Sequence, residues 1–439
     1  MTHPTAGAGG VADAVGVALP GNRWDLLDGI EPAVPPLVSV IVAHYRQQRQ
    51  LDRTLAALHR QDHPADRLEI VVVDDGSPER PVVPADVRLV VQEDLGFRLA
   101  AARNAGAAVA TGDVLCFLDA DTAPEPSYVR RLTRLPALAP DVVTVGRRRH
   151  ASFDDASAPA PASQPEPVEV AGPRTELGEP GWLRDAYARS RDLLDSDDRS
   201  YRYLIGAVTA CSRRLFDETG GYAESFTRYG GEDWEWAYRA WLAGALFAHV
   251  PGAVAWHDGP EWSGRPAADD RRAKNEEALL LAELIPVPGS RGRAARGRYA
   301  DVALRPPADP ASTAQSFVSV DSILVEVPEA RVASPAPGTP ADDAAFDRVR
   351  IEIVLHEPVR SSAGEIRAAV DRVATEQLGA VTLTDDRGTA LVTVRSTRAT
   401  RRMTRWADES LFASVATRAS GLSRVDAEPD VEGYLGGWS

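Results

Sequence analysis

A short apolar run that ends in two aspartates constrains the fold of this chain more than any other feature. Residues 113–118 read DVLCFL, and Asp119 and Asp121 follow directly. Such a run predicts a buried strand of an α/β sheet, and open α/β sheets bind their ligands at the carboxyl ends of strands. Two like charges there are costly unless a cation or a hydrogen-bond network compensates them. A divalent metal that carries a diphosphate explains the pair, and two solvated aspartates at a loop start are the alternative.

The first 120 residues alternate between segments typical of strands and segments typical of helices. Strands are predicted at 37–42, 68–73, 87–91 and 113–118, and helices at 51–58 and 98–110. This order predicts an α/β fold with a mostly parallel sheet and helices on both faces. Asp74 and Asp75 close the second strand, so we expect them at the same edge as Asp119 and Asp121. Four carboxylates would then surround one crevice.

Composition limits the classes of protein that fit this chain. Its 439 residues are enough for two or three domains. The net charge of -15 disfavours general binding to nucleic acid or anionic membranes. Cys116 and Cys211 lie in apolar stretches, which indicates core residues of a reduced protein. No window reaches the roughly 18 to 20 apolar residues of a membrane span, and the N-terminus lacks a signal-peptide pattern. We expect a cytoplasmic protein with no transmembrane segment, and peripheral membrane association stays open.

Seven sequence blocks follow one another along the chain: VSVIV at 38–42, LEIVVVDDGS at 68–77, GFRLAAARNAG at 96–106, FLDAD at 117–121, DRSYRY at 198–203, FTRYGGEDWEW at 226–236 and VAWH at 254–257. In this order they resemble the family 2 glycosyltransferases with a GT-A fold that bind nucleotide sugars. The series is most similar to the N-acetylgalactosaminyltransferase domain of bacterial chondroitin-polymerase-type enzymes. It covers residues 37–290.

The resemblance implies a metal-dependent, inverting transfer of a hexose or N-acetylhexosamine from a UDP-sugar to a hydroxyl of a glycan or another acceptor, as in polysaccharide biosynthesis. It implies Mn²⁺ or Mg²⁺ as cofactor, with Asp121 as the direct ligand, His257 completing the metal shell, and Asp119 near the ribose or a metal-bound water. Oxygen ligands suit such hard cations.

For the nucleotide, the resemblance implies that Asp75 bonds the uracil and that Asp74 supports the same loop. Arg103 corresponds to the family's arginine that approaches the donor. Tyr45 is expected to stack on the base. Ala43 departs from the family pattern because it lacks a side-chain hydroxyl, so the preference for uracil is less secure.

For the acceptor side, the resemblance implies that Asp233 is the general base. The neighbouring carboxylate Glu232 is expected to raise the pKa of Asp233 and so make it a better base. The alternative is an acidic helix N-terminus, which the helix dipole favours. Trp234 and Trp236 lie on different helix faces, so one is expected in the core and the other beside the sugar. The basic run 147–149 is expected to meet a diphosphate, an anionic acceptor or solvent.

The remaining segments predict the organisation of domains. We expect an N-terminal tail at 1–36, the transferase domain at 37–290 with an exposed insertion at 151–180, a linker at 291–345 that holds a strand at 322–327, and a small α/β module at 346–439. The module is either an accessory domain or a degenerate second transferase domain. Two other functions stay open. One is a sugar nucleotidyltransferase, although a Gly-rich opening loop followed by lysine is missing; the other is an inactive glycan-binding or scaffold protein.

Overall fold

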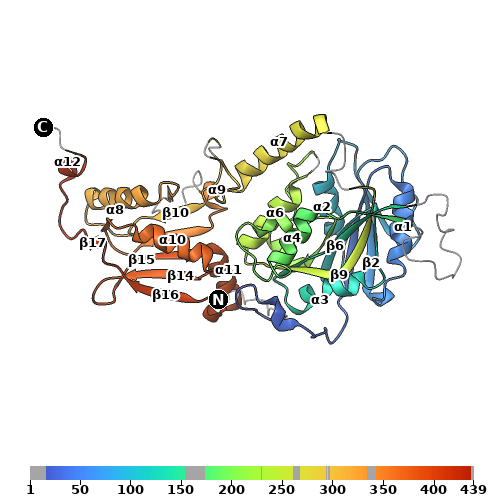
Figure 1. Ribbon diagram of the computed structural model, residues 1–439, viewed down its shortest axis with the longest axis horizontal. Coiled ribbons are helices and arrows are strands. Elements are labelled where there is room, and N and C mark those ends of the chain that lie inside the picture. Colours follow the sequence, from blue (N-terminus) through green and yellow to red (C-terminus); the bar gives the residue numbers. More distant parts are fainter. Residues whose placement is uncertain are drawn as a thin grey trace, which may run out of the picture.

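The computed structural model describes residues 16–153, 174–228, 230–260, 267–292, 294, 297–333 and 343–436. Figure 1 shows two sheets that lie side by side, each with its own helices. The first sheet belongs to the N-terminal part of the chain. The second belongs to residues 297–333 and 343–436, which we call the C-terminal module.

The first sheet has the strand order β3-β2-β1-β4-β8-β6-β9-β5, with β7 beside β6. Its strands are β1 (Val38–His44), β2 (Leu68–Asp74), β3 (Arg88–Val91), β4 (Val114–Asp119), β5 (Thr122–Pro124), β6 (Val142–Phe153), β7 (Arg174–Leu177), β8 (Val208–Ser212) and β9 (Leu246–Asp258). The strands β3, β2, β1 and β4 run parallel, and β8 is antiparallel to its neighbours. The predicted α/β fold is confirmed.

Helices pack against this sheet because its central strands are apolar on both faces. Every residue of β1 is buried, as an almost continuous apolar run requires. The helices are α1 (Gln48–Leu58), α2 (Leu99–Val109), α3 (Tyr128–Leu138), α4 (Gly181–Arg189), α5 (Arg213–Glu218), α6 (Glu232–Leu242) and α7 (Ala267–Leu284). Among the described residues, no helix is both long and apolar enough to cross a membrane.

The strand register brings the polar strand ends to one edge of the sheet. His44 at the end of β1 pairs with Asp74, and Ala43 pairs with Asp119. The short strand β5 follows Asp121 and pairs with β9, which sets Thr122 opposite His257. Segments that lie more than 200 residues apart in the chain therefore meet at this edge.

The N-terminal tail packs on the domain from Leu19 onward. Leu19 and Leu27 are buried against residues of α3, β6 and β9. Asn22 donates hydrogen bonds to the carbonyls of Leu193 (2.7 Å) and Phe247 (3.0 Å) and accepts one from the Phe247 amide (2.9 Å). A buried side-chain amide replaces missing backbone partners in this way. Of the expected insertion, 154–173 lies outside the described residues, and its flanks form the end of β6 and β7.

The second sheet has the strand order β11-β10-β12-β15-β14-β16. Its elements are β10 (Val302–Arg305), α8 (Thr313–Glu326), β11 (Arg331–Val332), α9 (Asp343–Phe346), β12 (Ile351–Leu355), α10 (Glu365–Thr375), β14 (Ala380–Thr384), β15 (Ala390–Ser396), α11 (Thr397–Trp406) and β16 (Ser414–Arg418). The pair β13 (Val359–Ser361) and β17 (Leu422–Arg424) and the helix α12 (Val431–Tyr434) lie beside it.

Two expectations for this region are wrong. Residues 322–327 were expected to form a strand, but they end helix α8, whose buried Ser319, Ser322 and Ile323 recur at helical spacing. The linker expected at 291–345 contains β10 and β11, which pair with each other, and β10 also pairs with β12. Short β-branched runs do not distinguish a strand from a buried helix, which explains the first error.

Candidate active site

A hollow of about 370 Å³ opens at the carboxyl edge of the first sheet. This size is typical of small-ligand sites, which span roughly 300 to 1,000 Å³. Its lining residues are Ala43, His44, Tyr45, Gln47, Asp75, Gly96, Phe97, Leu99, Ala102, Asp119, Asp121, Arg148 and His257. Three of the four predicted edge carboxylates line this first hollow.

The fourth carboxylate, Asp74, lies behind the wall. Its side chain is fully buried and contacts the His44 ring at 2.9 Å. The backbone amide of Gln47 donates to His44 Nε2 (3.1 Å), so Nδ1 carries the proton that His44 donates to Asp74. Ser77 donates to the same carboxylate through Oγ (2.6 Å) and its amide (3.1 Å). Asp74 therefore shapes the loop after β2 and does not line the hollow.

Asp75 lines the hollow and accepts hydrogen bonds from its far wall. The Arg98 amide donates to Asp75 Oδ2 (2.8 Å), and the Gln92 side chain donates to Oδ1. Burial raises the pKa of Asp75, against the effect of these donors. Tyr45 is 38% exposed at the mouth of the hollow, where its ring is accessible.

Asp121 and His257 face each other with 3.6 Å between Oδ2 and Nε2. The Gly259 carbonyl accepts a hydrogen bond from His257 Nδ1 (3.3 Å). The proton of the ring is then on Nδ1, and the lone pair of Nε2 points toward the Asp121 carboxylate. Burial raises the pKa of Asp121. Two acceptor atoms that face each other in this way fit a shared cation between them.

A complete set of protein ligands is not assembled at this point. Among the described residues, no three histidine, cysteine, aspartate or glutamate side chains are grouped as a metal site. Asp119 directs Oδ1 to Arg103 (2.9 Å), and Gln47 donates to Asp121 Oδ2 (3.0 Å). The donor set provided by the chain is thus Asp121 and His257, with Asp119 in the same wall.

Arg103 on α2 joins Asp119 to the start of helix α6. Its two terminal nitrogens donate to Asp119 Oδ1 and to Glu232 Oε1, each at 2.9 Å. The guanidinium is only 2% exposed. A buried cation needs such partners because desolvation disfavours its charge. Sequence position alone gives no indication of the contact between Arg103 and Glu232, which are 129 residues apart.

A second hollow of about 150 Å³ adjoins the first. Its lining residues are Leu99, Arg103, Asp119, Arg148, Trp182, Ile205, Ala207, Gly230, Gly231, Glu232, Asp233, Trp234, Lys274 and Glu277. Asp121 and Asp233 thus line different hollows. The two hollows share Leu99, Asp119 and Arg148, so they form adjoining parts of one cleft.

The two acids at the start of α6 are buried and carry raised pKa values. Burial, and then the charge of Asp233, raises the pKa of Glu232 to about 7. Burial also raises the pKa of Asp233, although the Gly206 amide (3.0 Å) and the Trp234 amide (2.8 Å) donate to its carboxylate. A carboxyl whose pKa lies near neutrality is suited to proton transfer.

Two glycines set the position of these acids. Gly230 has φ 99° and Gly231, the N-cap of α6, has φ 91°, a region that favours glycine. A Cβ on Gly230 would lie 2.7 Å from the Glu277 carboxylate of α7. Close packing of α7 against this turn therefore also requires glycine.

The structure distinguishes the two tryptophans of α6. Trp236 is 1% exposed and donates to Thr219 Oγ1 (3.0 Å), so it belongs to the core. Trp234 lines the second hollow, opposite Trp182, which is 49% exposed. Sequence reasoning missed Trp182, Gln47, Lys274 and Glu277 as site residues because none of them lies in a block with acidic or glycine-rich character.

Strand alternation divides the basic run of β6. Arg147 pairs with Glu179 (2.9 Å) and Arg149 with Glu176 (2.5 Å), whereas Arg148 lines both hollows. The Nε atom of Arg148 is buried and has no hydrogen-bond partner among the described residues. No ion pair to Arg148 occurs within the part of the chain that the structure describes. Arg148 is therefore a cation that the cleft itself leaves unpaired.

Family models match the region that contains this cleft. Residues 39–217 match the model for glycosyl transferase family 2, and residues 195–255 match the N-terminal domain of galactosyltransferase. Together the two matches include Asp75, Arg103, Asp119, Asp121 and Asp233. The chain therefore contains a family 2 glycosyltransferase domain, as the sequence blocks predict.

Curated relatives are similar over the same region. Chondroitin synthase from Escherichia coli is 31% identical over 267 residues, which is 57% of this chain and 38% of that protein. Hyaluronan synthase from Pasteurella multocida is 29% identical over 57% of this chain and 27% of its own length. Validoxylamine A glucosyltransferase from Streptomyces hygroscopicus subsp. limoneus is 33% identical over 46% of this chain and 48% of its own length. The chain thus spans half or less of each of these relatives.

Solved structures are similar at a lower level. A mannosyltransferase from Pyrobaculum calidifontis, in complex with GDP-Man and Mn²⁺, has a TM-score of 0.40 and 23% identity over 57% of this chain and 64% of that chain. GalNAc-T7 with UDP, GalNAc and Mn²⁺ has a TM-score of 0.39 and 19% identity over 56% of this chain and 48% of that chain. Similarities at this level carry no argument about ligands.

Proposed function

We propose that this protein transfers a sugar from a UDP-sugar to an acceptor hydroxyl with inversion, with the donor in the first hollow and the acceptor in the second. The observation that carries the proposal is the pair of hydrogen bonds from Arg103. They link Asp119 of the donor hollow to Glu232 beside Asp233, so both substrates would meet at one wall. Inversion needs the base on the side of the sugar opposite the leaving group.

On the donor side, Asp75 and Tyr45 are the residues that we assign to the base of the nucleotide. Asp75 holds an acceptor carboxylate at the wall, and Tyr45 presents an accessible ring. Ala43 brings only a methyl group and leaves backbone groups to complete the contact. Asp74 supports the nucleotide site indirectly, because its hydrogen bonds to His44 and Ser77 hold the loop that carries Asp75.

Asp121 and His257 are the residues that we assign to a Mn²⁺ or Mg²⁺ ion, with Asp119 beside it. Such an ion stabilises the negative charge of the departing diphosphate. The facing lone pairs of Asp121 and His257 support the assignment. Since the chain itself offers few ligands there, oxygens of the donor diphosphate would complete the shell.

On the acceptor side, Asp233 is the group that we assign to removing the proton from the attacking hydroxyl. Its raised pKa suits a base at neutral pH. Trp234 and Trp182 offer apolar faces on which a sugar ring can pack. Arg148 lies where the two hollows meet, so it is placed to stabilise the diphosphate as it leaves.

The names of the relatives suggest the class of sugar. Chondroitin synthase, hyaluronan synthase and a glucosyltransferase all fit transfer of a hexose or N-acetylhexosamine, to a glycan or to a small hydroxyl compound. A sugar nucleotidyltransferase would instead need a loop for a nucleoside triphosphate. An inactive scaffold would not need the carboxylates of the cleft, all of which are in place.

A screen of UDP-sugars for release of UDP, with and without Mn²⁺, tests the proposal. Wild type should release UDP in a metal-dependent manner and transfer the sugar when an acceptor is added. Asp121→Asn should lose both reactions, whereas Asp233→Asn should keep donor binding and lose transfer. No UDP release from any donor would favour the scaffold function. Formation of a sugar nucleotide from a sugar phosphate and a nucleoside triphosphate would favour the nucleotidyltransferase.

A further inference from the structure

Helix α6 has one end in the cleft and the other against the C-terminal module. Its first two residues are Glu232 and Asp233, both in the second hollow. Figure 1 shows α6 on the side of the first sheet that faces the module. Two adjacent buried carboxylates disfavour this position of the helix start, because each is desolvated and repels the other. The glycines before them, Gly230 and Gly231, carry no side chain that could anchor the turn.

The module contacts α6 near its N-terminal end through Arg348. Its guanidinium donates to Glu235 Oε1 at 2.5 Å, and the side chain of Glu235 is fully buried. Tyr238 of α6 donates to the Arg348 carbonyl (3.1 Å), and Arg348 also donates to the Leu284 carbonyl of α7 (3.0 Å). Glu235 is two residues from Asp233, so this contact lies within the first turn of the helix. Arg239 of α6 shares the carboxylate (2.7 Å).

The module also caps the carboxyl end of α6 with arginines of α11. Arg398 donates to the Ala245 carbonyl (3.2 Å), Arg402 to the Gly244 carbonyl (3.1 Å) and Arg405 to the Ala243 carbonyl (2.7 Å). These carbonyls belong to the turn after the last helical residue, Leu242, and the backbone amides of the same turn pair with carbonyls of the last turn of α6. Cations are favoured at that end because of the helix dipole.

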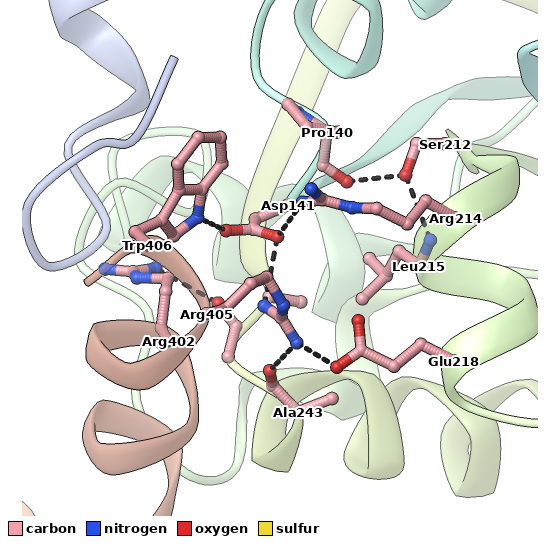
Figure 2. A network of polar contacts seen from close by, with 12 residues as sticks. Pro140, Asp141, Ser212, Arg214, Leu215, Glu218, Ala243, Arg402, Arg405 and Trp406 are labelled. Atoms are coloured by element: carbon pink, nitrogen blue, oxygen red, sulfur yellow. Dashed lines mark hydrogen bonds and ion pairs between the residues drawn. The ribbon is translucent and has the colours of Figure 1, made fainter. Parts of the chain in front are cut away.

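Asp141 fixes α11 in this position. As Figure 2 shows, it accepts from Arg405 (3.0 Å), Trp406 (2.6 Å) and Arg214 (2.9 Å), so one carboxylate joins both sheet domains. Gly244 contributes by its size, since a Cβ there would lie 2.9 Å from Cβ of Arg402. The turn after α6 and the helix α11 therefore pack in only one arrangement.

We propose that the C-terminal module holds α6 in register with the cleft, and that Arg348 is a positioning residue for Asp233. The inference rests on the proposed role of Asp233 as the base. Side-chain contacts along one face and at the far end of α6 oppose the tendency of the buried acids to move toward water. The module is thus a working part of the transferase and not a separate attachment.

Kinetics of the full-length variant Arg348→Ala test the inference. The readout is the ratio of sugar transfer to metal-dependent donor hydrolysis, because loss of folded protein lowers both rates equally and leaves the ratio unchanged. A displaced base should lower transfer selectively, by about tenfold or more, since small misplacements of reacting groups cost up to roughly 100-fold. Binding of the UDP-sugar should stay within about twofold of wild type, as the donor hollow is not contacted by Arg348.

Matched variants complete the test. Arg348→Lys keeps the charge beside Glu235 and should restore part of the ratio. Arg372→Ala removes an arginine of the same module that pairs with Glu376, the C-cap of α10, and it should leave the ratio unchanged. If Arg348→Ala does not fold, Arg405→Gln, which removes one cap of α6 at the edge of the interface, should lower the ratio in the same direction.

The outcomes separate the two proposals. A wild-type ratio in Arg348→Ala and in Arg405→Gln, with Asp233→Asn inactive in transfer, overturns the positioning role and leaves the proposed function intact. Normal transfer by Asp233→Asn overturns the proposed function itself.

Discussion

Arg103 shows how a single side chain can join the two hollows of the cleft. Burial opposes its charge, but Asp119, Tyr222 and Glu232 raise its pKa above the usual value. The guanidinium presents donors in a fixed fork, so it reaches a carboxylate in each hollow at the same time. Lysine would have to reach both carboxylates from one nitrogen and lacks this fixed fork.

The raised pKa values at the start of α6 predict the pH dependence of transfer. A base acts only when deprotonated, and burial raises the pKa of Asp233, so kcat should fall as the pH drops through the raised value. Burial, and then the charge of Asp233, raises the pKa of the neighbouring Glu232 to about 7, so two adjacent carboxyls contribute to the profile. In Glu232→Gln only one of them remains, and the acid limb should then follow Asp233 alone. A pH profile of kcat that stays flat down to the ordinary pKa of an aspartate, about 4, would contradict the assignment.

The position of Arg148 between the two hollows predicts that its substitution lowers kcat. Arg148→Gln should lower kcat by about 10- to 100-fold, because a hydrogen bond to a charged group contributes roughly 1.5 to 3 kcal/mol. Arg147→Gln, the neighbour on the opposite face of β6, serves as the control and should change kcat by less than about twofold, as an exposed ion pair contributes little. Steady-state kinetics with a fixed donor measure both. Equal kinetics for the two variants would show that Arg148 does not contact the leaving group.

At the scale of elements, α2 carries Arg103 and lies against β1 and β2. Close approach depends on Gly106, because a Cβ there would lie 2.4 Å from Cγ2 of Ile41 and 2.9 Å from Cγ2 of Val73. Alanine normally stabilises a helix by about 1 kcal/mol relative to glycine. The packing of α2 should reverse this preference.

Gly106→Ala should therefore lower the free energy of unfolding. Overpacking should cost about 1 to 3 kcal/mol, and the higher helix propensity of alanine should offset part of that cost. Chemical denaturation of the full chain measures the effect. Ala108→Gly, at an exposed position of the same helix, should cost about 1 kcal/mol through propensity alone. A more stable Gly106→Ala variant would show that α2 can move away from the sheet.

At the scale of the whole molecule, charged side chains with little exposure join the two sheet domains. Arg350 of the module pairs with Asp301 (2.8 Å) and also with Asp198 (2.5 Å) of the N-terminal part, and Asp198 accepts from Trp241 of α6 (2.9 Å). Removal of one partner from a buried ion pair leaves the other charge buried without compensation.

Asp141→Asn should be strongly destabilising for this reason. It removes the charge that Arg405 and Arg214 share, and loss of a partner in a buried pair costs roughly 3 to 5 kcal/mol. The midpoint and slope of urea unfolding provide the measurement. Asp195→Asn, in an exposed pair with Arg191, is the control and should change stability by less than about 1 kcal/mol. Equal effects of the two changes would show that Asp141 does not join the domains.

Local patterns in the sequence were enough to predict β1, β2, β3 and β4 of the first sheet and the acids that end β2 and follow β4. An apolar run followed by aspartates predicts a buried strand with acids at its end from adjacent residues alone. The start of α6 and the glycines before it are local in the same sense.

Only the tertiary structure decided which side chains face each other. Arg148 lines the cleft while Arg147 and Arg149 do not, and Trp234 lines it while Trp236 is buried, because strand pairing and helix packing set the direction of each side chain. The bond from Arg103 to Glu232 and the arginines that hold α6 join segments more than 100 residues apart. These contacts form only once the chain has folded, so no local pattern could have indicated them.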